Sequence, residues 1–196
     1  MHSDRTSTVV ALVGAPNSGK TTLFNWMSGA RFRAVNYPGA TVDCFRAETQ
    51  PRYGLPIAIL DTPGTYSLFP KSPEEEVTRA ALFENRLGFR IHQLVVVVDA
   101  TQLDRHLYFV RQLKEAGFDM VIALTMVDLL KRSGKSLDTK GLSQHLGVPI
   151  VEIDGRLGGG IPELISALHS RLENTQKQAE KNPSRQRLPA WSEDKS

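Results

Sequence analysis

The sequence predicts an α/β fold with a mostly parallel six-stranded sheet, one antiparallel edge strand and helices on both faces. Short apolar runs alternate with segments of helical period along nearly the whole chain. The 196 residues are 40% hydrophobic and 23% charged, as in ordinary soluble globular proteins. Apolar runs such as residues 94–98 have at most five residues, whereas roughly 20 are needed to span a bilayer. We therefore expect no direct membrane insertion by this chain.

Six segments are expected to form the strands. Five of them are rich in Val, Ile, Leu or Ala, and three end at Gly, Asp or Thr. In chain order they are residues 8–14, 42–48, 55–61, 94–98, 120–125 and 148–153. The second segment alternates polar and apolar residues, so we place it at the edge of the sheet and expect it to run antiparallel.

Helices are expected between these strands. They are residues 20–29, 72–85, 103–116, a short helix after Asp128, and residues 161–172. The second begins with Ser-Pro-Glu-Glu-Glu, in which the serine suits the cap, the proline the first turn and the acids the helix dipole. This spacing places helices on both faces of the sheet.

The chain divides into a globular body and a polar tail. Residues 1–173 are expected to form one domain, and residues 174–196 a flexible polar tail or linker with little to bury. The tail carries most of the net charge of +3, so the body is nearly neutral and no nucleic acid partner is expected. Cys44 is the only cysteine, which favours a reducing compartment.

The first glycine-rich segment is a phosphate loop. Residues 14–21 match G-x-x-x-x-G-K-[ST] and lie between a predicted strand and a predicted helix. Their backbone N–H groups are expected to face phosphate oxygens, with Lys20 bridging the β- and γ-phosphates and the Thr21 hydroxyl binding Mg²⁺. The nucleotide contacts expected here are Gly14, Ala15, Pro16, Asn17, Ser18, Gly19, Lys20, Thr21 and Thr22.

A D-x-x-G motif ends another predicted strand. Asp61 is expected to reach Mg²⁺ through water, and the N–H of Gly64 to bind the γ-phosphate, with Thr62 and Pro63 between them. As the second element after a phosphate loop, this motif is typical of GTPases.

A threonine is available to complete the Mg²⁺ shell. Thr41 lies in the loop of residues 36–43, after Gly39 and Ala40, which are also expected to contact the nucleotide. GTPases place a switch threonine there, and its hydroxyl binds Mg²⁺ only when the γ-phosphate is present.

The segment expected to read the base departs from the usual N-K-x-D. It reads Thr125-Met126-Val-Asp128, in which Asp128 would accept from guanine N–H groups that adenine lacks. Threonine in place of asparagine loses a hydrogen bond to the base, at a cost of about 1 kcal/mol. Asp154 and Gly155 stand where a Ser-Ala pair usually backs the base. An ATP-binding protein stays an alternative, which nucleotide competition would test.

Together these motifs resemble the N-terminal G domain of the ferrous iron transport protein B family of bacterial iron-uptake GTPases. The resemblance covers roughly residues 8–172. It rests on the phosphate-loop, switch and D-x-x-G segments and on the run Val98-Asp-Ala-Thr-Gln-Leu-Asp-Arg-His-Leu-Tyr108. It implies a GTP-binding G domain over residues 1–173 that hydrolyses GTP to GDP and phosphate.

The resemblance also implies partners outside this chain. A membrane permease domain and a helical subdomain follow the G domain in the family, so GTP would drive or regulate ferrous iron uptake through a separate part of the protein. The chain would then lie on the cytoplasmic face of the inner membrane, and be soluble in the cytoplasm on its own.

The catalytic residues expected from these motifs are Asn17, Lys20, Thr41 and Gly64. Thr65 stands where Ras-like proteins carry a glutamine, and no arginine finger is identifiable. Asn17 suggests K⁺ as the source of positive charge, because GTPases similar to this one use that asparagine to bind K⁺ beside the phosphates. The expected metal ligands are thus Thr21, Thr41 and Asp61 for Mg²⁺, and Asn17 for K⁺.

A free-standing Era-like GTPase that acts in RNA or ribosome assembly is the second hypothesis. Such proteins share the phosphate-loop asparagine and the D-T-P-G sequence, but they usually carry a basic RNA-binding domain. The near-neutral body argues against one.

Overall fold

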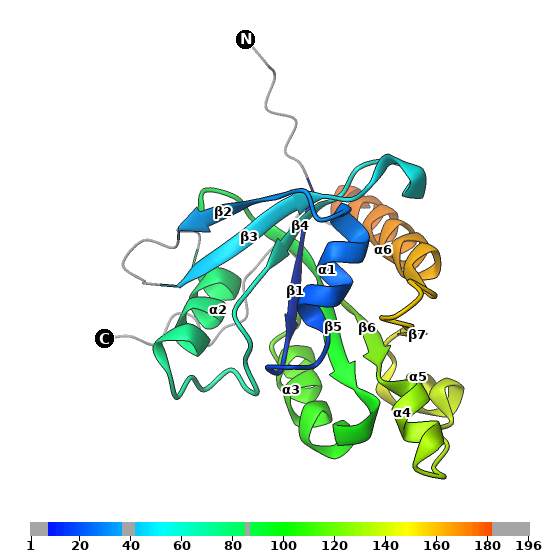
Figure 1. The fold of residues 1–196 in the computed structure, drawn as a ribbon. Coiled ribbons are helices and arrows are strands. Elements are labelled where there is room, and N and C mark those ends of the chain that lie inside the picture. Colours follow the sequence, from blue (N-terminus) through cyan, green and yellow to red (C-terminus); the bar gives the residue numbers. More distant parts are fainter. Residues whose placement is uncertain (1–7, 37–41, 85–86, 182–196) are drawn as a thin grey trace.

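The structure, a computed structural model, describes residues 8–36, 42–84 and 87–181. Within these ranges a seven-stranded sheet has the order β2-β3-β4-β1-β5-β6-β7 (Figure 1). The strands are β1 (Val9–Gly14), β2 (Phe32–Asn36), β3 (Asp43–Glu48), β4 (Ala58–Asp61), β5 (Ile91–Asp99), β6 (Met120–Thr125) and β7 (Ile150–Glu152).

Strand β2 corrects the expected edge of the sheet. The six predicted strands are all present, but β2 adds a seventh beside β3, so the strand expected at the edge lies second from it. Four of the five residues of β2 are exposed, so no burial pattern in the sequence marks it as a strand. It exists because β3 offers it a free row of backbone hydrogen-bonding groups.

The expected direction of β3 is confirmed. It pairs antiparallel with both β2 and β4, with Phe45 opposite Ala34 on one side and opposite Asp61 on the other. The pairs β1–β4, β1–β5, β5–β6 and β6–β7 are parallel. The fold is therefore mostly parallel with one antiparallel strand.

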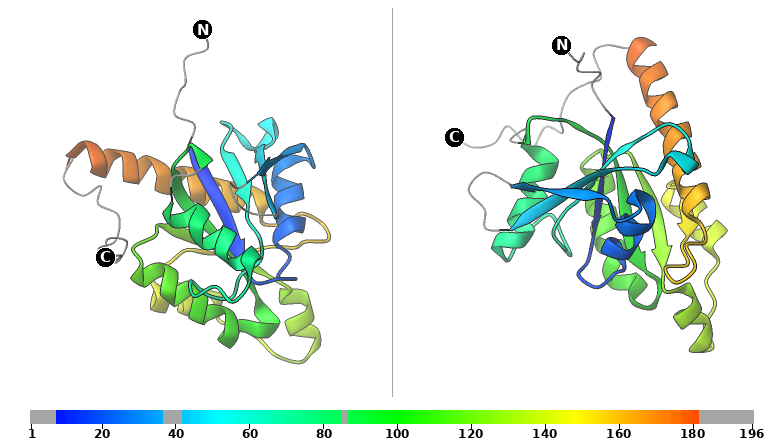
Figure 2. Two further views of the ribbon diagram at one scale, coloured as in Figure 1. Left: turned by 90° about the vertical axis from the view of Figure 1, so that its left-hand side faces the viewer. Right: turned by 45° about the horizontal axis from the view of Figure 1, so that its top comes forward.

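Helices cover both faces of the sheet (Figures 1 and 2). One buried cluster joins alternate residues of β1 to α1 and α6, and the other joins the remaining residues of β1 to α2 and α3. The helices are α1 (Lys20–Ser28), α2 (Pro73–Phe83), α3 (Leu103–Glu115), α4 (Val127–Arg132), α5 (Thr139–Leu146) and α6 (Ile161–Lys181).

Two helices differ from the sequence expectation. Helix α5 was not expected; it is only eight residues long and has no fully buried residue. Helix α6 continues to Lys181, beyond the expected end at residue 172. Helix α2 begins as predicted, because the Ser72 side chain accepts a 3.3 Å hydrogen bond from the Glu75 N–H and Pro73 occupies the first turn.

The carboxyl ends of the parallel strands meet at one edge of the sheet. There β1 ends at Gly14, β4 at Asp61, β5 at Asp99 and β6 at Thr125. Open α/β sheets bind ligands at this edge. The structure contains, in the part of the chain that it describes, no helix long and apolar enough to cross a membrane.

Candidate functional site

The phosphate loop turns tightly between β1 and α1. Gly14 has no room for a side chain, because a Cβ there would lie 2.5 Å from the carbonyl oxygen of Val97. Asn17 (φ 62°) and Gly19 (φ 90°) both adopt left-handed backbone conformations. Such alternation curls successive N–H groups toward one point, which forms a nest for an anion at the start of a helix.

Three of the predicted site residues converge beside this loop. The Lys20 ammonium lies 2.5 Å from Oδ1 of Asp61, and both side chains are less than a tenth exposed. Oγ1 of Thr21 lies 3.5 Å from Oδ2 of the same carboxylate. Burial raises the pKa of Asp61, and the neighbouring Lys20 charge opposes this shift. An ammonium, a hydroxyl and a carboxylate thus face the same space, a donor set that fits phosphate and Mg²⁺.

The D-x-x-G segment lies directly against the phosphate loop. The Thr62 hydroxyl donates a 2.9 Å hydrogen bond to the Leu12 carbonyl, and the Thr65 N–H donates one of 2.9 Å to the Gly14 carbonyl. Gly64 packs so closely that an added Cβ would lie 2.9 Å from the nitrogen of Pro16. A side chain at position 64 would therefore push the two phosphate-contact segments apart.

The switch threonine falls outside the residues that the structure describes. Thr41, with Gly39 and Ala40, belongs to residues 37–41, which are not described. The predicted third Mg²⁺ ligand therefore stays a prediction, while Thr21 and Asp61 are placed together.

Thr125 lies at the base of the phosphate loop. Its hydroxyl donates a 2.7 Å hydrogen bond to the carbonyl of Ser18, and its methyl side lies beside Gly19. The side chain is 4% exposed. Thr125 therefore ties the end of β6 to the loop, a contact that the sequence interpretation, which considered only the base, did not include.

Asp128 is placed at the start of α4 by a left-handed residue, Met126 (φ 57°). Its carboxylate is about half exposed and lies 3.7 Å from Arg132, one turn along the same helix. A surface ion pair of this kind adds little to the stability of a protein. The Asp128 carboxylate can therefore leave Arg132 and bind a ligand instead.

Asp154 and Gly155 open a compact loop after β7. Oδ1 of Asp154 accepts hydrogen bonds from the N–H groups of Arg156 (2.8 Å) and Leu157 (3.1 Å). The carbonyl of Gly155 accepts a 3.0 Å hydrogen bond from the indole N–H of Trp26 in α1. The Asp154 carboxylate is thus used to shape its own loop.

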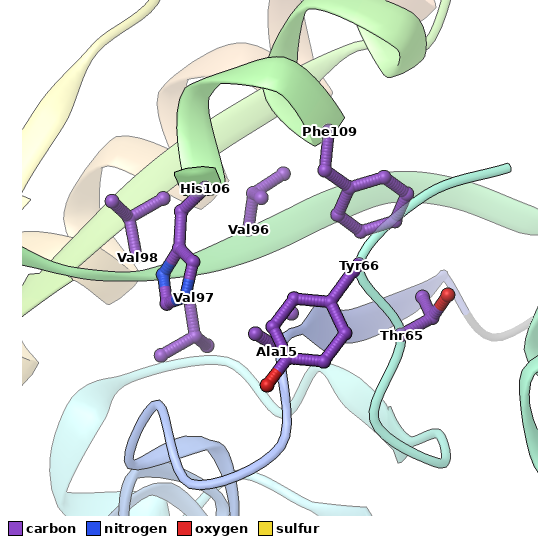
Figure 3. Close-up of a pocket in the computed structure, with 9 residues that line it drawn as sticks. Ala15, Thr65, Tyr66, Val96, Val97, Val98, His106 and Phe109 are labelled. Carbon is purple, nitrogen blue, oxygen red and sulfur yellow. The ribbon is translucent and has the colours of Figure 1, made fainter. Parts of the chain in front are cut away.

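Sequence reasoning did not single out a cluster under the phosphate loop. The Arg105 guanidinium lies 3.8 Å from the centroid of the Tyr66 ring, and the rings of Tyr66 and His106 are 6.3 Å apart. Figure 3 shows the Tyr66 ring beside Ala15, with His106 next to it. Arg105 and His106 belong to the run 98–108 that carried the family resemblance, but nothing in their spacing indicated this contact.

His106 also joins β5 to α3. Its Nδ1 accepts a 3.0 Å hydrogen bond from the N–H of Asp99, so the neutral ring carries its proton on Nε2. Burial lowers the pKa of His106, a shift that the Asp99 charge opposes.

An open groove of about 800 Å³ runs from the phosphate loop along the D-x-x-G segment to α3. Its lining includes Pro16 and Gly64 and the exposed rings of Phe69 and Tyr108. Among the residues that the structure describes, no group of three or more His, Cys, Asp or Glu side chains could hold a metal ion.

This fold and this loop define a G domain of the phosphate-loop class. The model of the family described as "Ferrous iron transport protein B" matches residues 8–168. The chain therefore belongs to the ferrous iron transport protein B family.

Individual relatives agree with this assignment. The chain is 46% identical over 169 residues to the Fe(2+) transport protein A/Fe(2+) transporter FeoB fusion protein of Porphyromonas gingivalis, covering 86% of this chain and 19% of that one. An NFeoB mutant of S. thermophilus bound to GDP superimposes with a TM-score of 0.73 at 40% identity, over 81% of this chain and 60% of that one. Another, bound to GMPPNP, gives a TM-score of 0.69 at 40% identity, over 81% of this chain.

The chain spans about a fifth of the length of the curated transporters that it matches. It also spans about 60% of the S. thermophilus NFeoB chain bound to GDP. It therefore represents one part of what those proteins contain.

Proposed function

We propose that this chain binds guanine nucleotides and hydrolyses GTP to GDP and phosphate, as the G domain of a ferrous iron transporter. The convergence of Lys20, Thr21 and Asp61 beside the phosphate loop carries this proposal. The binding of GDP and GMPPNP by similar S. thermophilus proteins supports it.

Phosphate binding would require Lys20 to change partners. Its ammonium now lies on Asp61, and triphosphate oxygens beside the loop would compete for it. The exchange is favourable because the loop N–H groups and the start of α1 add positive potential at the same point. Asp61, released from Lys20, would keep its negative charge by facing a cation.

Mg²⁺ would be held by Thr21 and, through water, by Asp61, with Thr41 as the third expected ligand. The cation would neutralise charge on the β- and γ-phosphates when bound. The backbone N–H of Gly64, which packs closely against Pro16, would bind the γ-phosphate. The attacking water would then be held by backbone groups and Thr41.

K⁺ would supply the positive charge that an arginine finger supplies in other GTPases. Asn17 lies in the phosphate loop three residues before Lys20, and its left-handed backbone gives the loop its curl. An amide oxygen there could hold K⁺ beside the β- and γ-phosphates, where negative charge grows in the transition state.

Asp128 would select guanine by accepting from its N1–H and N2–H₂ groups. The Thr125 hydroxyl donates its hydrogen bond to the Ser18 carbonyl, so Thr125 does not replace the asparagine that usually contacts the base. We therefore expect modest affinity and fast release, with the preference for guanine resting on Asp128.

The membrane part of the transporter would respond to changes in the phosphate-contact segments. We propose that residues 36–43 and 65–73 close on the γ-phosphate and relax after hydrolysis, as in other GTPases. The chain would act at the cytoplasmic face of the inner membrane, on a permease domain of the same protein, and would need no nucleic acid.

The base preference can be tested by calorimetric titration of the chain with GDP, ADP and xanthosine diphosphate. The wild type should bind GDP with modest affinity and ADP much more weakly. Asp128→Asn should transfer the preference to xanthosine diphosphate, because its C2 carbonyl accepts from an amide where guanine donates. Equal binding of GDP and ADP by the wild type would refute guanine recognition.

A further inference from the structure

Trp26 makes an unusual contact with the loop that follows β7. It lies in α1, six residues after Lys20, and its indole N–H donates a 3.0 Å hydrogen bond to the Gly155 carbonyl. The indole also packs flat against Gly158, where an added Cβ would lie 2.8 Å from Cε3 of Trp26. One side chain therefore holds both ends of the turn.

The loop of residues 154–160, here called the base-side loop, is rigid within itself. The N–H of Asp154 donates to the Gly159 carbonyl (2.9 Å), and the N–H of Gly158 donates to the Asp154 carbonyl (2.8 Å). Together with the Asp154 side-chain bonds to Arg156 and Leu157, these contacts close the loop on itself. It should therefore move as one piece, and its contacts with the rest of the protein decide where it lies.

Trp26 is itself firmly placed on α1. Its backbone carbonyl accepts a 2.7 Å hydrogen bond from the Gln50 side chain, and its ring packs against the core beneath α1 and α6. The helix that carries it starts at the phosphate loop. Trp26 thus sets the position of the base-side loop relative to the loop that would hold the phosphates.

We infer that Trp26 is a positioning residue that sets how long a guanine nucleotide stays bound. A nucleotide bound at the phosphate loop, with its base against Asp154 and Gly155, would dissociate only after the base-side loop moves away. A loop that is already held in place loses less conformational entropy when the nucleotide binds. Most of the resulting gain in affinity should appear as slower dissociation rather than as faster association. This inference rests on the guanine-nucleotide binding proposed above.

Two substitutions test the contact between Trp26 and the base-side loop, one in helix α1 and one in the loop. Trp26→Phe keeps most of the ring surface and removes the hydrogen bond to Gly155, and Gly158→Ala pushes the loop away from an intact Trp26. Gly134→Ala is the matched control, because Gly134 (φ 76°) has nearly the same backbone conformation as Gly158 (φ 75°) but open space around it. Any difference between the two alanine variants therefore reports the contact with Trp26.

The experiment is stopped-flow displacement of a fluorescently labelled GDP by excess GDP. Rates are compared rather than amplitudes, since removing an indole changes energy transfer to the label. Trp26→Phe should speed dissociation by about two- to tenfold, the range expected for one lost hydrogen bond. Gly158→Ala should speed it at least as much, with association nearly unchanged, and Gly134→Ala should match the wild type.

Competition by inorganic tripolyphosphate separates positioning from general damage to the fold. This ligand uses the phosphate loop alone, so it should bind both variants as it binds the wild type, whereas a disturbed α1 would weaken it. Dissociation rates of Trp26→Phe and Gly158→Ala equal to that of Gly134→Ala would overturn the inference while leaving the proposed function intact. A wild type that binds no GDP would instead overturn the proposed function and the inference with it.

Discussion

Lys20, Asp61 and Thr125 show how single side chains hold the site together. Lys20 and Asp61 neutralise each other in a nearly buried pair, and Thr125 binds the backbone of the phosphate loop from below. The placement of Lys20 and Asp61 beside the phosphate loop was predictable, because their motifs specify it. The Thr125 tie was not, since its partner is a backbone carbonyl 107 residues away and no motif encodes that contact.

Replacing Thr125 by valine should destabilise the protein by about 1–2 kcal/mol. The shape is nearly kept, but the Ser18 carbonyl loses a buried donor. Urea unfolding without nucleotide measures this loss, and Thr125→Ser, which retains the hydroxyl, should recover most of it. Equal stability of the valine variant and the wild type would show that the hydrogen bond contributes nothing.

His106 should make stability depend on pH. Its pKa is lowered in the folded protein, so below about pH 6.5 the unfolded chain binds a proton that the folded chain does not. Unfolding free energy should therefore fall as the pH drops from about 7 through 6.5 and below. Urea unfolding at several pH values should give a smaller fall for His106→Asn.

Part of that fall should remain in the variant, because burial also lowers the pKa of His92, whose Nδ1 accepts from the Val9 N–H. A pH dependence identical in His106→Asn and the wild type would contradict the assigned role of His106.

Strands and helices differ in how clearly the sequence indicates them. The central strands are continuous apolar runs buried on both faces, so β1, β5 and β6 could be predicted. Strand β2 could not, because four of its five residues are exposed and β3 is its only neighbour in the sheet. Helix α5 was missed for a similar reason, since none of its residues is fully buried.

Hydrogen exchange should reflect this difference between edge and centre. Amides of β5, which has a neighbour on each side and lies in the core, should exchange only on global unfolding. Amides of β2 should exchange orders of magnitude faster, because β2 is hydrogen-bonded on one side only and four of its five residues are already exposed. Mass spectrometry of peptic fragments provides the test, and equal protection of β2 and β5 would contradict this view of the edge.

In the whole molecule, one edge of the sheet brings together motifs from distant parts of the sequence. The phosphate loop, the D-x-x-G segment and the end of β6 meet there because parallel strands align their carboxyl ends. This convergence was predictable from the alternation of strands and helices. The position of the base-side loop was not, since it depends on an indole contact between α1 and a turn 129 residues away.

The most direct test of the account is GTP turnover by this chain without any partner, in KCl and in NaCl at equal ionic strength. We predict slow turnover that K⁺ speeds by about tenfold or more, since charge placed at the developing negative charge can contribute that much. Asn17→Ala should turn over GTP equally slowly in both salts while still binding GDP. A wild type with the same rate in both salts, or with no turnover in either, would contradict the account.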